Sequence, residues 1–457
     1  MLLAIDCGST NHKVALFDDR LKRRAVCSAP VRYTVRDAER VEFDPEWIWS
    51  STASLIREAC SEANVAPSAI TTIALASQAQ TFTLLESSGH PIMPFVSWAD
   101  KRAVGESDDI ASQLGDEFRR HCSFPSPMPQ LELSKLLWAR RHHPDWFNSD
   151  TRVVSLPSFL ALRLAGLHLT DNNLAGMSGL ASCRDNDWWP KTLSMCGLDR
   201  QQMGDLVALG QSASAQRKCE ELVFAPELRV VSAGNDQTAG AFANGCRSGR
   251  IVLTLGTALV VYRYAGETPG PFGNAGCWGP YPSGGFYELA ACDEGCAALD
   301  WAVEQILPGD ENHFFELAAT AVPGAALFYP QRMYQPDAWQ GAGTPDSMAR
   351  AVLEGICFRA RQMIEQKLKL ALHDAPVSVV GGGSQSTLWL EILANVLDCP
   401  VIRGDGDILL GAAMIARPEV TPPRNPGVQA IEPTRSTAAL YEDRYHSWLE
   451  QNQHASI

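Results

Sequence analysis

The fold of this chain is decided by the stretch Leu2-Leu3-Ala4-Ile5-Asp6-Cys7-Gly8-Ser9-Thr10, in which an apolar run ends in a turn that contains glycine. A second apolar run, Val14–Phe17, follows the turn. Two apolar runs on either side of a short glycine turn predict a β-hairpin. Because glycine permits positive φ and close approach, such a turn can present backbone N–H groups to an anion.

The same local design occurs again in the second half of the chain. Ile251–Leu253 leads into Thr254-Leu255-Gly256-Thr257, and the apolar run Leu259–Tyr262 returns. One such hairpin is ordinary. Two of them, one heading each half, suggest a duplicated fold that closes two anion-binding turns on one polyphosphate.

The length and composition indicate a globular chain of two domains. With 457 residues, the chain is too long for a single hydrophobic core. Its composition, 46% hydrophobic and 20% charged, is that of a globular and not of a disordered protein. Strands alternate with helices in both halves, which predicts an α/β fold. The pattern changes near Val231, so we expect domains at 1–231 and 232–457.

The net charge and the cysteines exclude several classes of protein. A net charge of −14 disfavours a nucleic-acid or anionic membrane surface, although backbone amides and Mg²⁺ can still provide a local site for a nucleotide. No apolar run reaches the roughly 18 residues of a membrane span, and no secretory leader is apparent. The 13 cysteines are scattered without CxxC pairs. We therefore expect reduced thiols and a cytoplasmic protein.

A triple-glycine turn follows a predicted strand in Ser378-Val379-Val380-Gly381-Gly382-Gly383-Ser384, and we expect a helix over Gln385–Leu397. Glycines before a helix N-terminus let a phosphate or a base meet free N–H groups. The spacing Gly381-x-Gly383-x-x-Ser386 lacks the third glycine of a dinucleotide fingerprint, and no P-loop motif occurs. A tight turn without a ligand remains an alternative.

A carboxylate stands at the predicted domain junction, in Ala233-Gly234-Asn235-Asp236-Gln237. We expect Asp236 at the N-cap of a helix of small residues, where it could serve only to satisfy free N–H groups. Alternatively, at a cleft between domains, it could accept a proton from a substrate hydroxyl that attacks a γ-phosphate.

Two further segments each end a strand of the first half: Ser77-Gln78-Ala79-Gln80-Thr81 and Trp98-Ala99-Asp100-Lys101-Arg102. Amides, an indole and charged groups suit a polyhydroxylated ligand, which needs donors, acceptors and an apolar face. The alternative is that Asp100 and Arg102 form a structural ion pair and that Trp98 only packs.

With these motifs in order, the chain from Leu2 to about Ala416 resembles the FGGY family of carbohydrate kinases, and leans towards its L-fuculokinase- and xylulokinase-like members. The resemblance rests on four blocks: Leu3–Phe17, Gly234–Gly245, Leu253–Val261 and Val379–Val401. They are similar to the family's first phosphate, catalytic, second phosphate and adenosine motifs. The resemblance implies a duplicated actin/hexokinase-like (ribonuclease H-like) α/β fold of two domains with an interdomain cleft.

The resemblance also implies roles for single residues. Asp236 would be the general base, and Asp6 would lie near Mg²⁺. The nucleotide would contact Gly8, Thr10, Lys13, Gly256, Thr257, Gly382, Gly383 and Ser386. The substrate would contact Gln78, Gln80, Trp98 and Gln237, and Asp100 joins them by its place beside Trp98.

Departures from the family pattern leave the sugar open. Gln80 replaces the usual histidine, and the loop Tyr329–Tyr334 lacks the usual glutamate. Gln237 matches the glycerol kinase pattern better than the xylulokinase or fuculokinase pattern. We expect an ATP- and Mg²⁺-dependent kinase for a terminal hydroxyl of a small sugar or polyol; a homodimer is left open. The alternatives are a catalytically inactive regulator with this fold, and a nicotinamide-dependent oxidoreductase, against which the missing glycine weighs.

Overall fold

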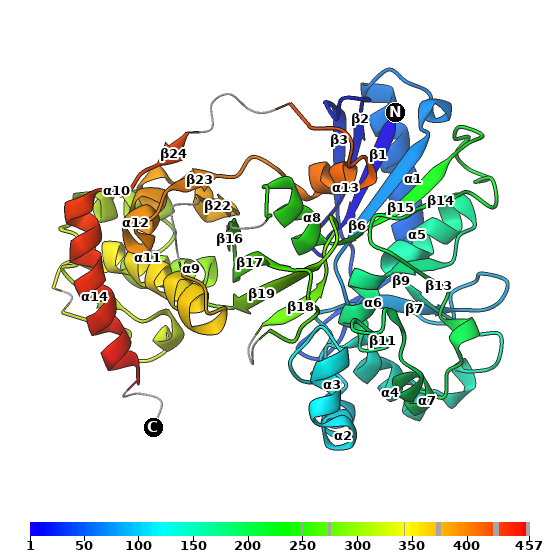
Figure 1. Cartoon of the computed structure of the whole chain (residues 1–457), viewed down its shortest axis with the longest axis horizontal. Helices are drawn as coiled ribbons and strands as arrows, with labels where there is room; N and C mark the ends of the chain where they lie inside the picture. Colours follow the sequence, from blue (N-terminus) through cyan, green and yellow to red (C-terminus); the bar gives the residue numbers. More distant parts are fainter. Residues whose placement is uncertain (248–249, 273–275, 342, 372–375, 424–428, 454–457) are drawn as a thin grey trace.

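Two mixed β-sheets organise the chain, one in each lobe of the molecule (Figure 1). The structure is a computed structural model, and it describes residues 1–247, 250–272, 276–341, 343–371, 376–423 and 429–453. The blue-to-green lobe contains the first sheet, and the lobe coloured from light green to red contains the second (Figure 1).

The first sheet begins with the predicted hairpin. Its strands, in spatial order, are β14 (Ser212–Ser214), β15 (Arg229–Asn235), β6 (Thr72–Ser77), β1 (Leu2–Cys7), β2 (Asn11–Phe17) and β3 (Arg23–Pro30). β1 pairs antiparallel with β2 and parallel with β6, and β6 pairs parallel with β15. All six residues of β1 are buried because helices cover both faces of the sheet.

The second sheet repeats this arrangement. Its strands are β18 (Cys277–Pro280), β19 (Phe286–Cys292), β17 (Leu259–Gly266), β16 (Ile251–Leu255), β22 (Val377–Val380), β23 (Val401–Arg403) and β24 (Ala430–Ile431). From β24 to β19 the pairings run antiparallel, parallel, parallel, antiparallel, antiparallel, as they do from β14 to β3. The predicted duplication is therefore confirmed at the level of strand order and direction.

Helices pack on both sheets. The longer ones are α1 (Pro45–Glu62), α5 (Leu156–Ala165), α8 (Asp236–Ala243), α9 (Cys296–Ile306), α10 (Glu311–Thr320), α11 (Pro345–Gln362), α12 (Thr387–Leu397), α13 (Ile408–Ala416) and α14 (Arg435–Gln453). Because side chains alternate along a strand, Leu3 and Ile5 join the core with α1 and α5, whereas Leu2 and Ala4 face α8 and α13. None of the described helices combines the length and the apolar character needed to cross a membrane.

A smaller unit, which the sequence did not predict, extends the first lobe. It contains the sheet β4 (Val35–Arg36), β5 (Val41–Phe43), β8 (Phe95–Val96), β7 (Phe82–Leu85) and β9 (Arg152–Ser155), with α2 (Val104–Leu114), α3 (Asp116–His121), α4 (Glu132–His142), α6 (Asn172–Ser178) and α7 (Pro190–Met195). Much of this unit has its own apolar core. It carries Trp98 and the polar network that lies beneath it.

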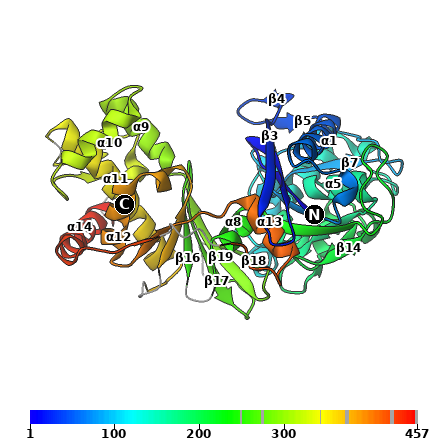
Figure 2. The same cartoon turned by 90° about the horizontal axis from the view of Figure 1, so that it is seen from above.

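Two helices of small residues lie between the lobes. α8 continues from β15, and α13 follows β23 of the second sheet but packs on β1 and β6 of the first (Figure 2). A Cβ on Gly411 would lie 1.9 Å from the Ala239 carbonyl oxygen, so only glycine permits this approach. The first sheet runs on to Asn235, and a division at residue 231 would fall within β15.

Candidate active site

Three adjacent parallel strands of the first sheet end side by side. Cys7 pairs with Ser77, and Ser77 pairs with Asn235. The Gln78 N–H donates to the Cys7 carbonyl at 3.1 Å. The residues that follow these strands are Gly8, Gln78 and Asp236. They therefore lie together along the edge of the sheet that is formed by the carboxyl ends of the parallel strands. Sheet edges of this kind are where α/β proteins bind ligands.

A cavity of about 240 Å³ lies between this edge and the second sheet. The first sheet and the helix α8 that continues from it contribute Asp6, Lys13, Asp236 and Gln237. The second sheet contributes Thr254, Val380 and the adjoining Gly381, and the crossing segment 406–409 also lines the cavity. The predicted interdomain cleft is thus present. The other predicted residues, from the phosphate turns to Trp98, lie outside its immediate lining.

Asp6 is the most deeply buried of the cavity's carboxylates, with only 2% of its surface exposed. In the described part of the chain, its Oδ1 atom has no hydrogen-bond partner. Lys13 stands opposite Asp6 in the hairpin register. Burial raises the pKa of Asp6 to about 7, nearby Asp236 and Asp407 add to this, and Lys13 opposes it. The carboxylate is therefore placed where a cation would stabilise its charged form.

Asp236 is the first residue of α8 rather than its N-cap, which corrects the expectation from sequence. The N-cap is Asn235, whose side chain accepts a hydrogen bond from the Thr238 N–H at 2.6 Å. Asp236 Oδ1 accepts the adjacent Gln237 N–H at 2.8 Å. Burial raises the pKa of Asp236 to about 6, which suits a group that must take up a proton near neutral pH.

A third carboxylate, Asp407, was missed by the sequence analysis. It caps α13 through the Leu410 N–H at 2.9 Å, and Arg23 donates to both of its oxygens at 2.6 Å. Carboxylate oxygens are the ligands that hard divalent cations prefer, so the unpartnered Oδ1 of Asp6 beside Asp236 fits such an ion. The only local signal for Asp407 was its place after the glycines 404 and 406.

The two glycine turns of the second half lie against each other. Gly381 has φ +94°, and a Cβ there would lie 2.4 Å from the Leu255 carbonyl oxygen. Gly383 is packed against Trp389, whereas a Cβ on Gly382 would meet nothing within 4 Å. Close packing, against backbone at Gly381 and against side chains at Gly383, therefore requires two of the three glycines, and Gly382 is the one open to a ligand.

The helix after this turn begins later than expected from sequence. A 3₁₀ turn spans Gly382–Gln385, and α12 starts at Thr387 instead of Gln385. The Ser386 hydroxyl accepts from the Trp389 N–H at 3.2 Å and so caps α12. At the other turn, the Gly256 carbonyl accepts from the Cys296 N–H at 2.7 Å, and Thr257 is exposed.

On the acceptor side, Gln78 and Gln80 line a small cavity, but their side chains differ. Gln78 is 4% exposed, and neither amide atom has a partner among the described residues. Gln80 uses both atoms within the protein: Oε1 accepts from the Glu132 N–H at 2.9 Å, and Nε2 donates to the Met177 carbonyl. Only Gln78 leaves an unpaired amide for a ligand.

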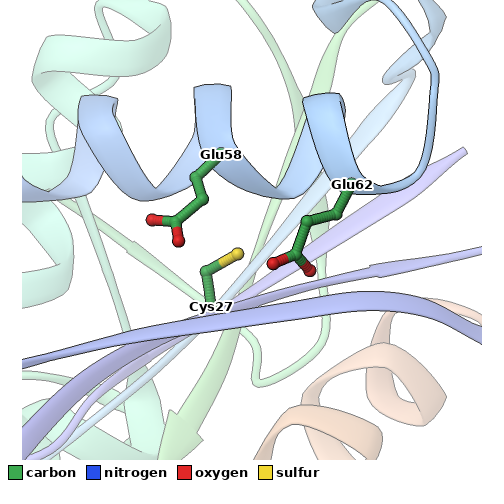
Figure 3. Close-up of side chains that lie close together, drawn as sticks. All are labelled: Cys27, Glu58 and Glu62. Carbon is green, nitrogen blue, oxygen red and sulfur yellow. The ribbon is translucent and has the colours of Figure 1, made fainter.

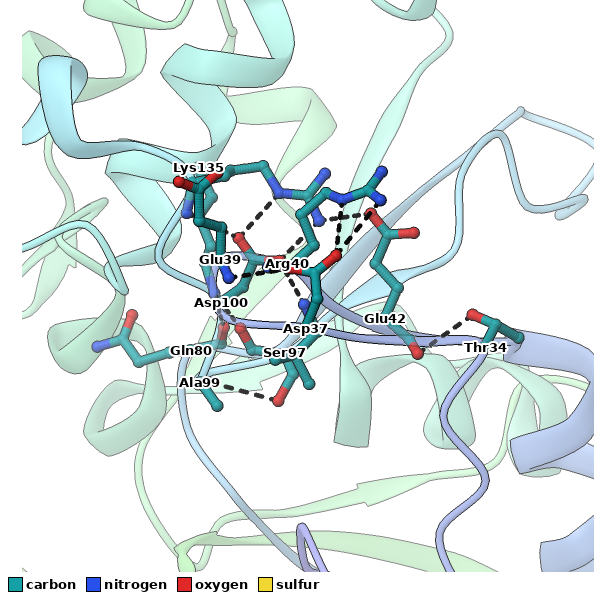
Figure 4. A network of polar contacts seen from close by, with 12 residues as sticks. Thr34, Asp37, Glu39, Arg40, Glu42, Gln80, Ser97, Ala99, Asp100 and Lys135 are labelled. Atoms are coloured by element: carbon teal, nitrogen blue, oxygen red, sulfur yellow. Dashed lines mark hydrogen bonds and ion pairs between the residues drawn. The ribbon is translucent and has the colours of Figure 1, made fainter.

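Trp98 and Asp100 also differ. Trp98 is 46% exposed, which leaves much of its surface open to solvent. Asp100 is fully buried; it accepts from Arg102 Nε at 2.8 Å and from the Val41 N–H at 2.8 Å (Figure 4). This arrangement favours the structural ion pair that the sequence left open for Asp100.

A group of metal-binding residue types lies away from the cavity, where Cys27 on β3 faces Glu58 and Glu62 on α1 (Figure 3). Burial and the two carboxylates raise the pKa of the Cys27 thiol to about 11. The thiol is therefore protonated at neutral pH, and a metal would need the thiolate. Nothing else in the described residues points to an ion there.

Comparison with known proteins gives the family. The sequence profile of the FGGY carbohydrate kinase N-terminal domain matches residues 1–243, and that of the C-terminal domain matches residues 251–417. The chain is 26% identical over 443 residues to the L-fuculokinase of Escherichia coli K12, covering 91% of each protein. It is 25% identical over 479 residues to the xylulose kinase of the same strain, covering 97% of each.

The fold also matches known structures. The Plasmodium falciparum glycerol kinase with ADP superposes with a TM-score of 0.85 at 15% identity, over 98% of this chain and 97% of that one. Two domains of repeated topology, a cleft between them and both family profiles lead to one conclusion. The chain belongs to the FGGY family of carbohydrate kinases, which are phosphotransferases with the two-domain actin/hexokinase-like fold.

Proposed function

We propose that this kinase transfers the γ-phosphoryl group of ATP to a terminal hydroxyl of a small sugar or polyol, with Asp236 as the general base. The observation that carries the proposal is the position of Asp236 in the interdomain cavity, with its pKa raised to about 6 and its N-cap role taken by Asn235. A carboxylate of this kind can accept the hydroxyl proton as the oxygen attacks phosphorus.

Asp6 is the residue that would hold Mg²⁺, since it offers a buried oxygen without a hydrogen-bond partner among the described residues. When bound, the ion neutralises phosphate charge. Lys13, beside Asp6, would add a positive charge at the phosphates. The backbone N–H groups of Gly8 and Thr10 in the first turn would contribute donors. Most of the catalysis then comes from positioning and charge neutralisation.

The nucleotide would lie against the two glycine turns that follow β16 and β22 of the second sheet, which we call the glycine edge. Gly256, Thr257, Gly382 and Gly383 are the proposed contacts, and the open position of Gly382 supports close approach of a ligand. Ser386 stays near this edge, but its hydroxyl caps α12 and its N–H donates to the Gly383 carbonyl at 3.3 Å, so the ligand contact would come from the turn before it.

The acceptor would lie near the carboxyl ends of the parallel strands of the first sheet, where polar side chains gather. Gln78, Trp98 and Gln237 are the proposed contacts, supported by the unpaired amide of Gln78 and the exposed indole of Trp98. Gln80 and Asp100 would act through the loops that they hold. The relatives named L-fuculokinase, xylulose kinase and glycerol kinase direct the search to small ketoses and polyols.

An acceptor screen tests the proposal. ADP release is measured over pentuloses, 6-deoxyketoses, tetritols and glycerol, with and without Mg²⁺. We expect one class to give Mg²⁺-dependent ADP release, and its product to carry a phosphate ester. If ATP and an acceptor bind but no ADP forms, the inactive regulator is correct. Binding of NADH in preference to ATP would favour the oxidoreductase.

A further inference from the structure

Lys135 on α4 is a buried lysine directly beneath the acceptor side of the site. Lys135 is only 2% exposed. Its Nζ donates to two backbone carbonyls, those of Gln80 at 2.6 Å and Ser97 at 2.7 Å (Figure 4). Burying an ammonium group is costly unless the geometry compensates, so this placement needs a reason.

Charged groups and an aromatic ring surround the Lys135 amino group, and Nζ lies 5.7 Å from the centre of the Phe82 ring. Burial is the largest effect and lowers the pKa of Lys135. Asp100 and Glu132 oppose this shift and Arg102 adds to it, so the net direction is downward. Asp100 is in turn held by Arg102 and the Val41 N–H. The network in Figure 4 therefore surrounds one buried hydrogen-bond donor that lies between two loops.

The first loop carries Gln78 and Gln80. Gln80 has φ +61°, a left-handed conformation that is uncommon for residues other than glycine. The Gln80 side chain accepts from the Glu132 N–H in the first turn of α4, where the N-cap Leu131 has no side-chain hydrogen bond. The loop caps α4, and Lys135, one turn further along α4, holds the Gln80 carbonyl. The two elements fix each other.

The second loop carries Trp98. Ser97, whose carbonyl Lys135 holds, is fully buried, and the next residue is the exposed Trp98. The Trp98 N–H donates to Thr81 Oγ1 at 3.1 Å, which links the second loop back to the first. The Lys135 amino group thus joins the backbone near the unpaired amide of Gln78 to the backbone beside the Trp98 indole.

We propose that Lys135 is a positioning residue for the acceptor: it sets the distance between the Gln78 amide and the Trp98 ring without touching the sugar. The proposal rests on the proposed function for the identity of the ligand. It explains why two loops that differ in sequence and lie 17 residues apart at Thr81 and Trp98 share hydrogen bonds to one buried lysine. It also assigns the left-handed Gln80 a purpose in the geometry of the site.

The test replaces Lys135 by methionine, which keeps much of the aliphatic stem and loses the charge and the donors. Lys135→Met should lower kcat/KM for the acceptor by about 10–100-fold, since small displacements of binding groups are costly. It should leave the Kd for ADP within about twofold. Lys218→Met, at an exposed lysine outside both loops, is the matched control and should change neither constant.

A second readout does not need activity. Hydrogen exchange of the ligand-free protein should become faster in segments 77–81 and 97–100 of Lys135→Met, and stay unchanged in segment 254–258. If Lys135→Met does not fold, Lys135→Arg keeps a charged donor with a different geometry and should show a smaller loss of the same kind. Equal losses for acceptor and nucleotide, or unchanged exchange in the two loops, would overturn the proposal. Absence of any phosphorylated acceptor for the wild type would overturn the function, while the exchange result still decides the role of Lys135.

Discussion

The two halves of the molecule share one strand plan but differ in what their strand ends carry. Following the hairpin register and the parallel pairings, Asp6 in the first sheet corresponds to Thr254 in the second, and Gln78 corresponds to Gly382. Carboxylate and amide side chains occupy the first edge, whereas hydroxyl and glycine residues occupy the second. The two copies of the fold therefore differ in what they present. The strand ends of the first sheet offer polar side chains, and those of the second expose backbone to a ligand.

The largest test of this division is Asp236→Asn. If the first edge does the chemistry, kcat should fall by about 10²–10⁴-fold, the range expected for loss of a general base, with little change in ATP affinity. Steady-state kinetics with the acceptor found in the screen and titration with ATP measure both quantities. Turnover at the wild-type rate would mean that Asp236 has only a structural role.

A second difference is the histidine of the first hairpin. His12 is fully buried next to Cys7, at the position that Leu259 occupies in the second hairpin, and Nε2 lies 2.7 Å from Thr52 Oγ1. Burial lowers the pKa of His12 to about 4, so the folded state keeps it neutral.

In the unfolded chain, His12 binds a proton once the pH falls below its ordinary pKa of about 6.5. In the folded protein, His12 stays neutral until about pH 4. This group's contribution to stability is complete above pH 6.5 and should decrease by about 3 kcal/mol as the pH falls to 4. Urea unfolding of the wild type and of His12→Leu at pH 7 and pH 5 measures it, because the difference between the two proteins removes the opposing titration of Asp6. Parallel pH dependence in the two proteins would contradict the prediction.

The third test addresses the glycine edge. Gly381→Ala places a Cβ 2.4 Å from the Leu255 carbonyl oxygen at φ +94°, so it should destabilise the protein by about 2 kcal/mol or more. Gly382→Ala is the matched control, because its Cβ meets nothing within 4 Å. Denaturant midpoints of the two variants should differ clearly. Equal midpoints would show that the turn relaxes and that its geometry is not fixed by packing.

The smallest expected effects separate the ligands. Trp98→Ala should raise the acceptor KM by about tenfold and leave nucleotide use nearly intact, because an apolar binding face is lost. Thr257→Val should do the reverse. Trp98 is 46% exposed, so its loss should cost little stability. If each variant changed the KM for the acceptor and the KM for ATP in the same proportion, the assignment of acceptor and nucleotide to different strand ends would be wrong.

The sequence predicted those features whose signals are local. Both hairpins have apolar strands and a glycine within a few residues, and both are confirmed. The start of α12 was placed two residues early, because the 3₁₀ turn Gly382–Gln385 continues the same polar pattern. Asn235 and Asp236 are both good capping residues, and only the backbone conformation assigns the cap to Asn235.

What the sequence could not provide are contacts between distant residues. Arg23 and Asp407 meet although they are 384 positions apart. Gln80 resembled a ligand for sugar because amides suit hydroxyl groups, yet its partners lie on α4 and α6, far along the chain. Such pairings depend on how the helices pack on the sheets, which the pattern of single residues does not encode.

The position of α13 has a consequence for how this protein can be divided. The helix is made by the C-terminal part of the chain, but it completes the apolar core of the first sheet through Leu409, Ala412 and Ala413. A polypeptide that ends at residue 243 would therefore leave one face of that sheet uncovered. The two segments matched by separate family profiles are therefore not separable, because α13, which lies in the second segment, completes the core of the first lobe.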